Sequence, residues 1–266
     1  MPNKIVIYSN DSIQSKKTGK VLKEKLEKSG YLVTDRFCPE ADLLVCIGGD
    51  GTFLRAIHNL DFPSLPIIGI NTGHLGFFQE INPDKLDDFI FNYGQEKYMI
   101  QNLSPVQVRI KTQNGEYMHT GLNEVVIEGE STRSVHLNIS IGGNFIERFS
   151  GNGILISSPA GSTAYNYSLK GSIVDPRLKL LQVTPIAPMN TVAYRSFTSS
   201  ILLPPDLSLG VVPDVNAKNS IKIAYDGFNA SYDHIEDITV EFSEKEIHLM
   251  RFSDYDFWTK VKSKFL

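Results

Sequence analysis

The stretch LLVCIGGDGTFLRAI, residues 43–57, joins two apolar segments through a turn that holds three glycines and one acidic residue. Its first segment, Leu43–Ile47, has the length and composition of a strand buried on both faces. The segment from Phe53 onward predicts a helix. A glycine-rich turn between a parallel strand and a helix presents backbone amides at the carboxyl edge of the sheet, where open α/β sheets bind ligands. The stretch therefore predicts an α/β domain with an anion site at this turn.

The rest of the first hundred residues continues this alternation of strands and helices. Strands are predicted at residues 4–8, 31–33 and 66–70, and amphipathic helices within residues 18–31 and 84–93. Apolar strands separated by amphipathic helices indicate a doubly wound parallel sheet that is covered on both faces.

From about residue 98 the pattern changes to short, often alternating apolar segments bounded by turn residues, ending with KEIHLMRF at residues 245–252. This pattern is typical of an antiparallel β-sandwich or several small sheets. The tail, residues 254–266, predicts an amphipathic helix that packs back on the first domain. We therefore expect an α/β domain at residues 1–100, joined by residues 252–266, and a β-rich domain at residues 101–251.

The composition narrows the class of protein. With 41% hydrophobic residues, 21% charged residues and a formal charge of −4, the chain is typical of a globular protein and has no basic surface for nucleic acid or membrane. No apolar run approaches the roughly 18 residues of a membrane helix. The N-terminal apolar stretch is too short for a signal peptide, so we expect a cytoplasmic protein. Neither the two cysteines nor the six histidines form a metal-ligand motif, and we predict no protein-bound metal site.

The expected phosphate loop is GGDGT, in which Gly48, Gly49, Gly51 and Thr52 would surround the phosphate. Asp50 is its one acidic residue. Such a carboxylate can accept a proton from a substrate hydroxyl or help to hold a divalent cation. The alternative is that Asp50 only caps the following helix. No Gly-Lys-Ser/Thr follows and no GxGxxG occurs, so neither a Walker loop nor a hydride-transfer cofactor gains support.

Four motifs occur in a fixed order: GGDGT at residues 48–52, INTGHLGFF at 70–78, LNEVVI at 122–127 and GILISSPAGSTAY at 153–165. Together with the KEIHLMRF ending, this set resembles the NAD kinase family over nearly the whole chain. The resemblance implies a phosphotransferase that moves the terminal phosphoryl group of ATP or polyphosphate to the 2′-hydroxyl of the adenosine ribose of NAD, giving NADP. It also implies Asp50 as the general base, a Mg²⁺ ion bound mainly through the donor phosphates, and a homodimer or homotetramer assembled through the β-rich domain.

The resemblance further implies a set of residues that bind the dinucleotide. An amide can donate and accept hydrogen bonds, a carboxylate can accept them from two neighbouring ribose hydroxyls, and a flat ring can stack on adenine. The set is Gly51, Asn123, Glu124, Ser150, Asn152, Thr163, Ala164, Tyr165, Asn166, Tyr167, Ser168 and Ala187. The alternatives are a plain turn at Asn123 and an inert Ser/Thr-rich loop at residues 162–168. Asp226-Gly227 matches a family pair near the ligand, with a simple β-turn as its alternative.

Three positions depart from the family pattern. Asn152 stands where the family has aspartate, Ser150 where arginine is common, and Phe228 where glutamine is usual. These departures put dinucleotide binding, rather than the base at Asp50, in question. Two other hypotheses also remain open. One is a lipid kinase-like enzyme, because diacylglycerol and sphingosine kinases share GGDGT. The other is a protein that binds the dinucleotide without catalysis.

Overall fold

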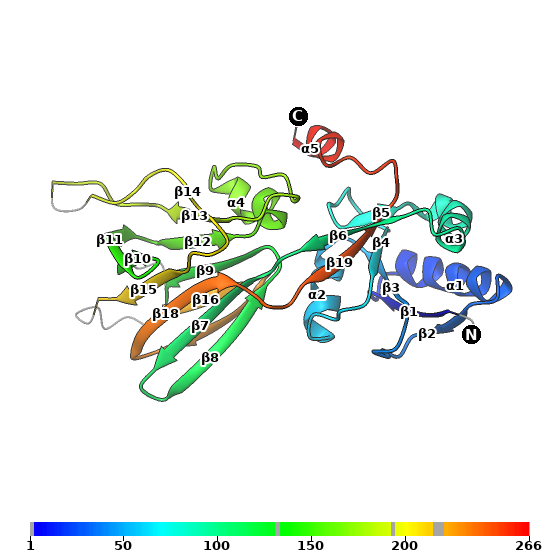
Figure 1. The fold of residues 1–266 in the computed structure, drawn as a ribbon, viewed down its shortest axis with the longest axis horizontal. Helices are drawn as coiled ribbons and strands as arrows, with labels where there is room; N and C mark the ends of the chain where they lie inside the picture. The colour runs from blue at the N-terminus through cyan, green and yellow to red at the C-terminus, as the bar shows by residue number, and fades with distance from the viewer. Residues whose placement is uncertain (1–2, 131–133, 193–194, 215–220, 266) are drawn as a thin grey trace. The chain divides into compact units, whose positions relative to one another are not determined.

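The computed structural model describes residues 3–130, 134–192, 195–214 and 221–265. The chain divides into two compact units, shown in Figure 1. Unit 1 comprises Met1–Leu103 with Lys245–Leu266, and unit 2 comprises Ser104–Glu244. Within the described residues, no helix is both long and apolar enough to cross a membrane.

Unit 1 is built on a seven-stranded sheet in the order β2-β1-β3-β4-β19-β6, with β5 paired to β4. All pairs are parallel except β19 with β6. The strands are β1 (Lys4–Ser9), β2 (Leu32–Thr34), β3 (Leu43–Gly48), β4 (Ile67–Asn71), β5 (Gln79–Ile81), β6 (Met99–Leu103) and β19 (Ile247–Arg251). The helices are α1 (Ile13–Lys28), α2 (Asp50–Asn59), the 3₁₀ turn η1 (Pro83–Lys85), α3 (Leu86–Gly94) and α5 (Phe257–Phe265).

Helices cover both faces of this sheet, which confirms the predicted doubly wound arrangement. Figure 1 shows α1 and α3 on one side and α2 on the other. Leu26 of α1 and Phe89 of α3 pack in one cluster with Val45 of β3. The neighbouring residue Cys46 points to the opposite face and is also fully buried, as is Phe53 of α2. This two-sided burial explains why the strands read as continuous apolar runs.

The C-terminal helix α5 packs on unit 1, as predicted. Its buried face includes Phe257 and Val261, which are four residues apart. The ring of Phe77 lies 5.8 Å from that of Phe257 and 6.0 Å from that of Phe265, measured between ring centroids. The helix is therefore held beside the segment that follows β4.

The position of β19 differs from the sequence prediction, which assigned residues 101–251 to the β-rich domain. Strand β19 instead lies in the unit 1 sheet, where Leu249 pairs with Ile67 of β4 and β6 runs antiparallel along its other edge. The Ile-His-Leu alternation suggested a half-exposed strand. In the structure Leu249, Met250 and Arg251 are all buried, because the sheet is covered on both faces.

Unit 2 consists of two six-stranded antiparallel sheets, as expected for a sandwich-like domain. Side chains from both sheets, among them Val108, Leu137, Ile127 and Ile156, form one apolar core. The first sheet has the order β11 (Asn144–Gly151), β10 (Val135–Ile141), β15 (Leu209–Pro213), β18 (Ile235–Phe242), β7 (Val106–Thr112), β8 (Gly115–Gly121). The second has the order β14 (Ile201–Leu203), β13 (Leu181–Ile186), β12 (Gly153–Ser157), β9 (Glu124–Gly129), β16 (Ile221–Tyr225), β17 (Phe228–Tyr232).

Gly69 in the centre of β4 provides a test of the packing in unit 1. A Cβ atom at this position would lie 2.6 Å from the carbonyl oxygen of Phe78 and 2.8 Å from Cα of Gln79. Because both neighbours are backbone atoms, we expect Gly69→Ala to lower the free energy of unfolding by about 1–3 kcal/mol, the usual range for overpacking. Urea unfolding measures the loss. Gly73→Ala, where a Cβ would meet nothing within 4 Å, is the matched control and should change stability far less.

Candidate active site

Asp50 is the first residue of α2, but its side chain does not cap that helix. The N-cap residue is Gly49, so no side chain caps the N-terminus of α2. The Asp50 carboxylate instead accepts two backbone hydrogen bonds, from the Phe77 amide to Oδ2 and from the Phe78 amide to Oδ1, each at 3.0 Å. These bonds join the GGDGT turn to the end of the INTGHLGFF segment. They orient the carboxylate at the helix N-terminus, so the cap alternative does not describe this residue.

The glycines around Asp50 fall into two kinds. At Gly76 a Cβ atom would lie 2.4 Å from Asp50 Oδ1, and at Gly48 it would lie 2.2 Å from Thr52 Oγ1, so both positions require glycine for close packing. At Gly49 a Cβ atom would meet nothing within 4 Å, and at Gly51 only an Arg55 nitrogen at 3.8 Å. The loop is therefore tight on its inner side and open at Gly49 and Gly51, which leaves the room that a phosphate needs to approach backbone amides.

Polar residues at the carboxyl ends of β1, β3 and β4 support this loop. Thr52 is buried, and its Oγ1 accepts a hydrogen bond of 2.9 Å from Nδ2 of Asn10, which follows β1. Asn71 at the end of β4 accepts a hydrogen bond from the Gly73 amide. The hydroxyl of Thr52 is thus engaged inside the protein, and Asn71 closes the turn that follows β4.

Arg251 of β19 is a component of this site that sequence reasoning missed. Its side chain is 3% exposed and donates to the Phe77 carbonyl at 3.0 Å, to Glu80 Oε2 at 3.0 Å and to Gln101 Oε1 at 2.9 Å. The Phe77 residue therefore links Arg251, through its carbonyl, to Asp50, through its amide. The sequence contained one indication of this role, the arginine in KEIHLMRF. An arginine inside a buried strand needs polar or charged partners, which predicts an internal ion pair.

Two lysines of α5 also lie near Asp50. Lys264 Nζ is 3.8 Å from Asp50 Oδ2. Lys260 donates to the Gln79 carbonyl and lies 3.8 Å from Glu80 Oε2. Burial and, next, the nearby positive charge of Arg251 lower the pKa of Lys260 to about 8. The C-terminal segment thus contributes several cations to the surroundings of one carboxylate.

In unit 2, Asp226 gives the Asn-Glu motif its geometry. Asp226 lies in the two-residue turn between β16 and β17, where it adopts φ +46°. Its carboxylate accepts hydrogen bonds from the backbone amides of Leu122 at 2.6 Å, Asn123 at 2.8 Å and Glu124 at 3.4 Å. The Asp-Gly pair therefore forms the β-turn that was the alternative prediction. In addition, Asp226 anchors the backbone of residues 122–124, which a simple β-turn would not do.

Asn123 and Glu124 present buried acceptors to an approaching ligand. Within the described part of the chain, Asn123 Oδ1 and Glu124 Oε2 are buried and have no hydrogen-bond partner. Burial raises the pKa of Glu124 to about 8, repulsion from Asp226 adds to the rise, and a backbone hydrogen bond with Tyr165 opposes it. Buried acceptors normally have donors, so this pair is suited to the hydroxyl groups of a sugar.

The loop after β12 packs directly on this pair. Ser158 donates from its backbone amide to the Asn123 carbonyl at 2.9 Å and from its hydroxyl to the Leu122 carbonyl at 2.6 Å. A Cβ atom on Gly161 would lie 2.0 Å from the Asn123 carbonyl oxygen, so glycine is required there. This loop continues through the 3₁₀ turn η3 (Ala160–Thr163) into the short helix α4 (Tyr165–Ser168).

The predicted residues of this loop differ in their exposure. Thr163 is buried, Ala164 is half-buried, and Tyr165, Tyr167 and Ser168 are exposed, Tyr165 by 43%. Asn166 is fully buried, and its amide bonds the carbonyls of Ser162 and Ser172 and accepts from Thr184. Its side chain therefore holds the loop together from inside.

The remaining predicted residues lie elsewhere in unit 2. Ser157, at the end of β12 near the motif, pairs with Glu124, whereas Gly153 at the other end pairs with Glu128. Asn152 precedes Gly153, so it lies beyond the far end of the strand, roughly 13 Å or more from Ser157 at about 3.3 Å per residue. Two further predicted residues lie at this same end, Ser150 and Ala187. The Ser150 hydroxyl is 2.7 Å from His136 Nδ1. Ala187 is exposed and has a backbone φ of +43°. Within one copy of the chain, the predicted dinucleotide residues of unit 2 therefore form two groups, one near Glu124 and one near Asn152.

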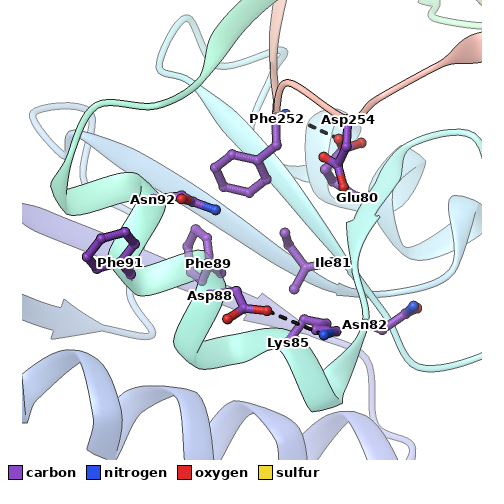
Figure 2. Close-up of a pocket in the computed structure, with 10 residues that line it drawn as sticks. All are labelled: Glu80, Ile81, Asn82, Lys85, Asp88, Phe89, Phe91, Asn92, Phe252 and Asp254. Atoms are coloured by element: carbon purple, nitrogen blue, oxygen red, sulfur yellow. Dashed lines mark hydrogen bonds and ion pairs between the residues drawn. The ribbon is translucent and has the colours of Figure 1, made fainter.

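Unit 1 also contains a cavity that no sequence motif indicated, shown in Figure 2. It has a volume of about 410 Å³ and lies between α3, β5 and the segment after β19. Its lining residues are Glu80, Ile81, Asn82, Lys85, Asp88, Phe89, Phe91, Asn92, Phe252 and Asp254. Since neither Asp50 nor the glycine loop lines it, this cavity is separate from the candidate active site.

Comparison with known proteins identifies the family of this chain. A family model described as the ATP-NAD kinase N-terminal domain matches residues 6–98, and one described as the ATP-NAD kinase C-terminal domain matches residues 122–252. The chain is 40% identical over 267 residues to an NAD kinase of Finegoldia magna, covering 98% of this chain and 97% of the relative. It is 32% identical over 264 residues to NAD kinase 1 of Oceanobacillus iheyensis, covering 98% and 97%.

Two solved structures share the fold. The yeast NADH kinase complexed with NADH superposes with a TM-score of 0.84 at 18% identity, covering 99% of this chain and 87% of that one. An NAD kinase from Archaeoglobus fulgidus in complex with ATP gives a TM-score of 0.74 at 22% identity, covering 99% of both chains. The family match over residues 122–252 includes the Asn-Glu and Gly-Ser-Thr-Ala-Tyr motifs, for which a lipid kinase-like enzyme gives no reason.

Arg251 yields a prediction on stability. Arg251→Met leaves the buried carboxylate of Glu80 without its main partner, and breaking a buried ion pair from one side typically costs about 3–5 kcal/mol. We expect a loss of that order in the free energy of unfolding, measured by urea denaturation. Lys25→Met is the matched control, because Lys25 and Asp87 form an exposed pair in the same unit. It should cost less than about 1 kcal/mol. Equal losses in the two variants would contradict the role given to Arg251.

Proposed function

The chain belongs to the NAD kinase family, and we propose that Asp50 is the general base of its phosphoryl transfer. The enzyme transfers a terminal phosphoryl group to the 2′-hydroxyl of the adenosine ribose of NAD, giving NADP. The observation that carries our proposal is the orientation of the Asp50 carboxylate by the amides of Phe77 and Phe78, beside a glycine loop that is open to a ligand. A ribose hydroxyl is a weak nucleophile until its proton can move to a base.

In the proposed reaction, the 2′-oxygen bonds to the terminal phosphorus of ATP while the bond from phosphorus to the leaving oxygen of ADP breaks. The hydroxyl proton passes to an oxygen of Asp50. The amides at Gly49 and Gly51 and the N-terminus of α2 bind phosphate oxygens, so positioning and charge neutralisation lower most of the remaining barrier.

A Mg²⁺ ion fits this proposal as a companion of the donor phosphates. Both Asp50 oxygens already accept amide hydrogen bonds, and Lys264 lies 3.8 Å from one of them, so the ion would be held by the donor phosphates rather than by this carboxylate. The ion would neutralise phosphate charge when bound.

We assign Asn123 and Glu124 to the ribose hydroxyls of the dinucleotide, because their buried acceptors lack donors among the described residues. Tyr165, with its exposed ring, and Thr163 and Ala164 from the same loop are assigned to the adenine. Gly51 is assigned to phosphate binding as part of the phosphate loop. Tyr167 and Ser168 are assigned to the rim of this site, and Asn166 to the support of its loop, which its internal hydrogen bonds suggest.

The finer properties of the enzyme are also proposals. They are a cytoplasmic location, polyphosphate as an alternative donor, and a homodimer or homotetramer formed through unit 2. Apolar side chains on the edge strand β11 favour such an assembly, since Phe145 and Ile146 are 67% and 48% exposed. We assign Ser150, Asn152 and Ala187 to dinucleotide binding within the oligomer, because they lie apart from Glu124 in a single copy.

The direct test of Asp50 is the substitution Asp50→Asn. Asparagine keeps the shape of the side chain but cannot accept the proton, so we expect turnover to fall by about two orders of magnitude or more. NAD affinity should stay close to that of the wild type. Thermal stability should fall only by the loss of one of the two amide hydrogen bonds, because Nδ2 of asparagine cannot accept it. NADP formation with MgATP and, separately, polyphosphate measures turnover, and Asp87→Asn, an exposed residue of α3, is the control. Unchanged turnover would contradict the assignment, and a wild type that binds NAD but forms no NADP would favour the non-catalytic alternative.

Glu124 gives a prediction on pH. Its pKa of about 8 means that it is largely protonated in the free protein at pH 7. Ribose hydroxyls donate to the ionised form and favour it, so NAD binding should release a proton and tighten as the pH rises from 6 towards 8. Calorimetry in buffers of different ionisation enthalpy measures the release. Glu124→Gln should bind NAD with no such release. A release of equal size in both proteins would rule out Glu124 as its source.

A further inference from the structure

The phosphate loop of this chain contains no cation of its own. Thr52 and Phe53 follow the last glycine of GGDGT, so there is no lysine at the place where a Walker loop carries one. Yet phosphoryl transfer develops negative charge on the oxygens of the moving group, and enzymes normally place a lysine or arginine against it. The charge must therefore come from another element of unit 1.

Lys264 of α5 is in a suitable position. Its Nζ lies 3.8 Å from Asp50 Oδ2 and 4.8 Å from the centroid of the Phe77 ring. The side chains of Lys264 and Asp50 remain 32% and 27% exposed, so a ligand that approaches the carboxylate also meets the ammonium group.

The packing of α5 explains this position. Phe257, Val261 and Phe265 follow one another at intervals of four residues along the helix, and the two aromatic rings contact Phe77. The lysines at positions 260 and 264 form a second row at the same interval, which places them next to each other on the helix surface.

The two lysines differ in what they are free to do. Lys260 is engaged inside the protein, because it donates to the Gln79 carbonyl and lies near Glu80. Lys264 is more exposed and has the Asp50 carboxylate as its ion-pair partner. Lys264 is therefore the cation of this row that can turn to a phosphate.

We propose that Lys264 is a catalytic residue that binds the terminal phosphoryl group of the donor and stabilises its negative charge during transfer. The inference rests on the proposed role of Asp50. As the 2′-oxygen bonds to phosphorus and the bond to the ADP oxygen breaks, Asp50 takes the hydroxyl proton. Lys264 keeps its protons and donates hydrogen bonds to the phosphoryl oxygens. It thus supplies from the C-terminal helix the charge that a Walker loop takes from its own lysine.

The test measures NADP formation by the full-length enzyme with MgATP and NAD. We expect Lys264→Ala to lower kcat on the order of 10- to 100-fold, the value of one charged hydrogen bond, with the KM for NAD changed less than about twofold. Lys264→Arg should recover most of the loss, because it restores the charge. The matched control is Lys262→Ala, an exposed lysine on the same helix, which should behave as wild type.

A second measurement separates a phosphate-binding role from simple support of Asp50. In an Asp50→Asn background the ion pair is already absent, so a lysine that only orients Asp50 has no further effect. We expect calorimetry to show that Asp50→Asn/Lys264→Ala binds MgATP at least about fivefold more weakly than Asp50→Asn alone.

Equal MgATP affinity of these two proteins would overturn the proposal, as would wild-type turnover of Lys264→Ala. Arg55 is the cation of α2 nearest to Gly51. A fall in turnover and MgATP affinity in Arg55→Ala, with no such fall in Lys264→Ala, would also overturn the proposal. Each of these results leaves the base assignment intact as long as Asp50→Asn loses turnover, so the two proposals fail independently.

Discussion

The site in unit 1 depends on two hydrogen bonds, from the backbone amides of Phe77 and Phe78 to the two oxygens of Asp50. A carboxylate on the first residue of a helix would otherwise be free to rotate or to cap its own helix. The two amides hold it in one orientation and connect β3 with the segment after β4. Gly76 makes this possible, because a side chain there would occupy the space of the carboxylate. The remaining features of the unit support this pair of bonds.

The C-terminal segment provides much of that support, although it is almost two hundred residues away in the sequence. Arg251 of β19 binds the carbonyl of Phe77, and the aromatic face of α5 packs on the ring of the same residue. Phe77 is thus held through its carbonyl, its amide and its side chain. The return of the chain to the first sheet therefore positions the proposed base, and through Lys264 it also brings a positive charge to the loop.

Much of this could be predicted from residue patterns. Continuous apolar runs, glycine turns and helical spacing indicated the parallel sheet and the phosphate loop, and four ordered motifs indicated the family. Long-range contacts could not be predicted. The alternation in residues 247–249 did not reveal that β19 is covered on both faces. Asp226 looked like a turn residue because the amides that it binds, at residues 122–124, are distant in the sequence. The separation of Asn152 from Glu124 follows from strand register, which sequence spacing does not show.

The central claim is that Asp50 receives the proton of the ribose 2′-hydroxyl. A crystal structure of the enzyme with NAD and a non-hydrolysable ATP analogue tests it most directly, through the distance between the Asp50 carboxylate and the 2′-oxygen. We predict about 2.6–3.2 Å, the range for direct proton transfer, with the amides of Phe77 and Phe78 still bound to the carboxylate. An Asp50 carboxylate that points away from the ribose, with another side chain at hydrogen-bond distance from the 2′-oxygen, would contradict the claim.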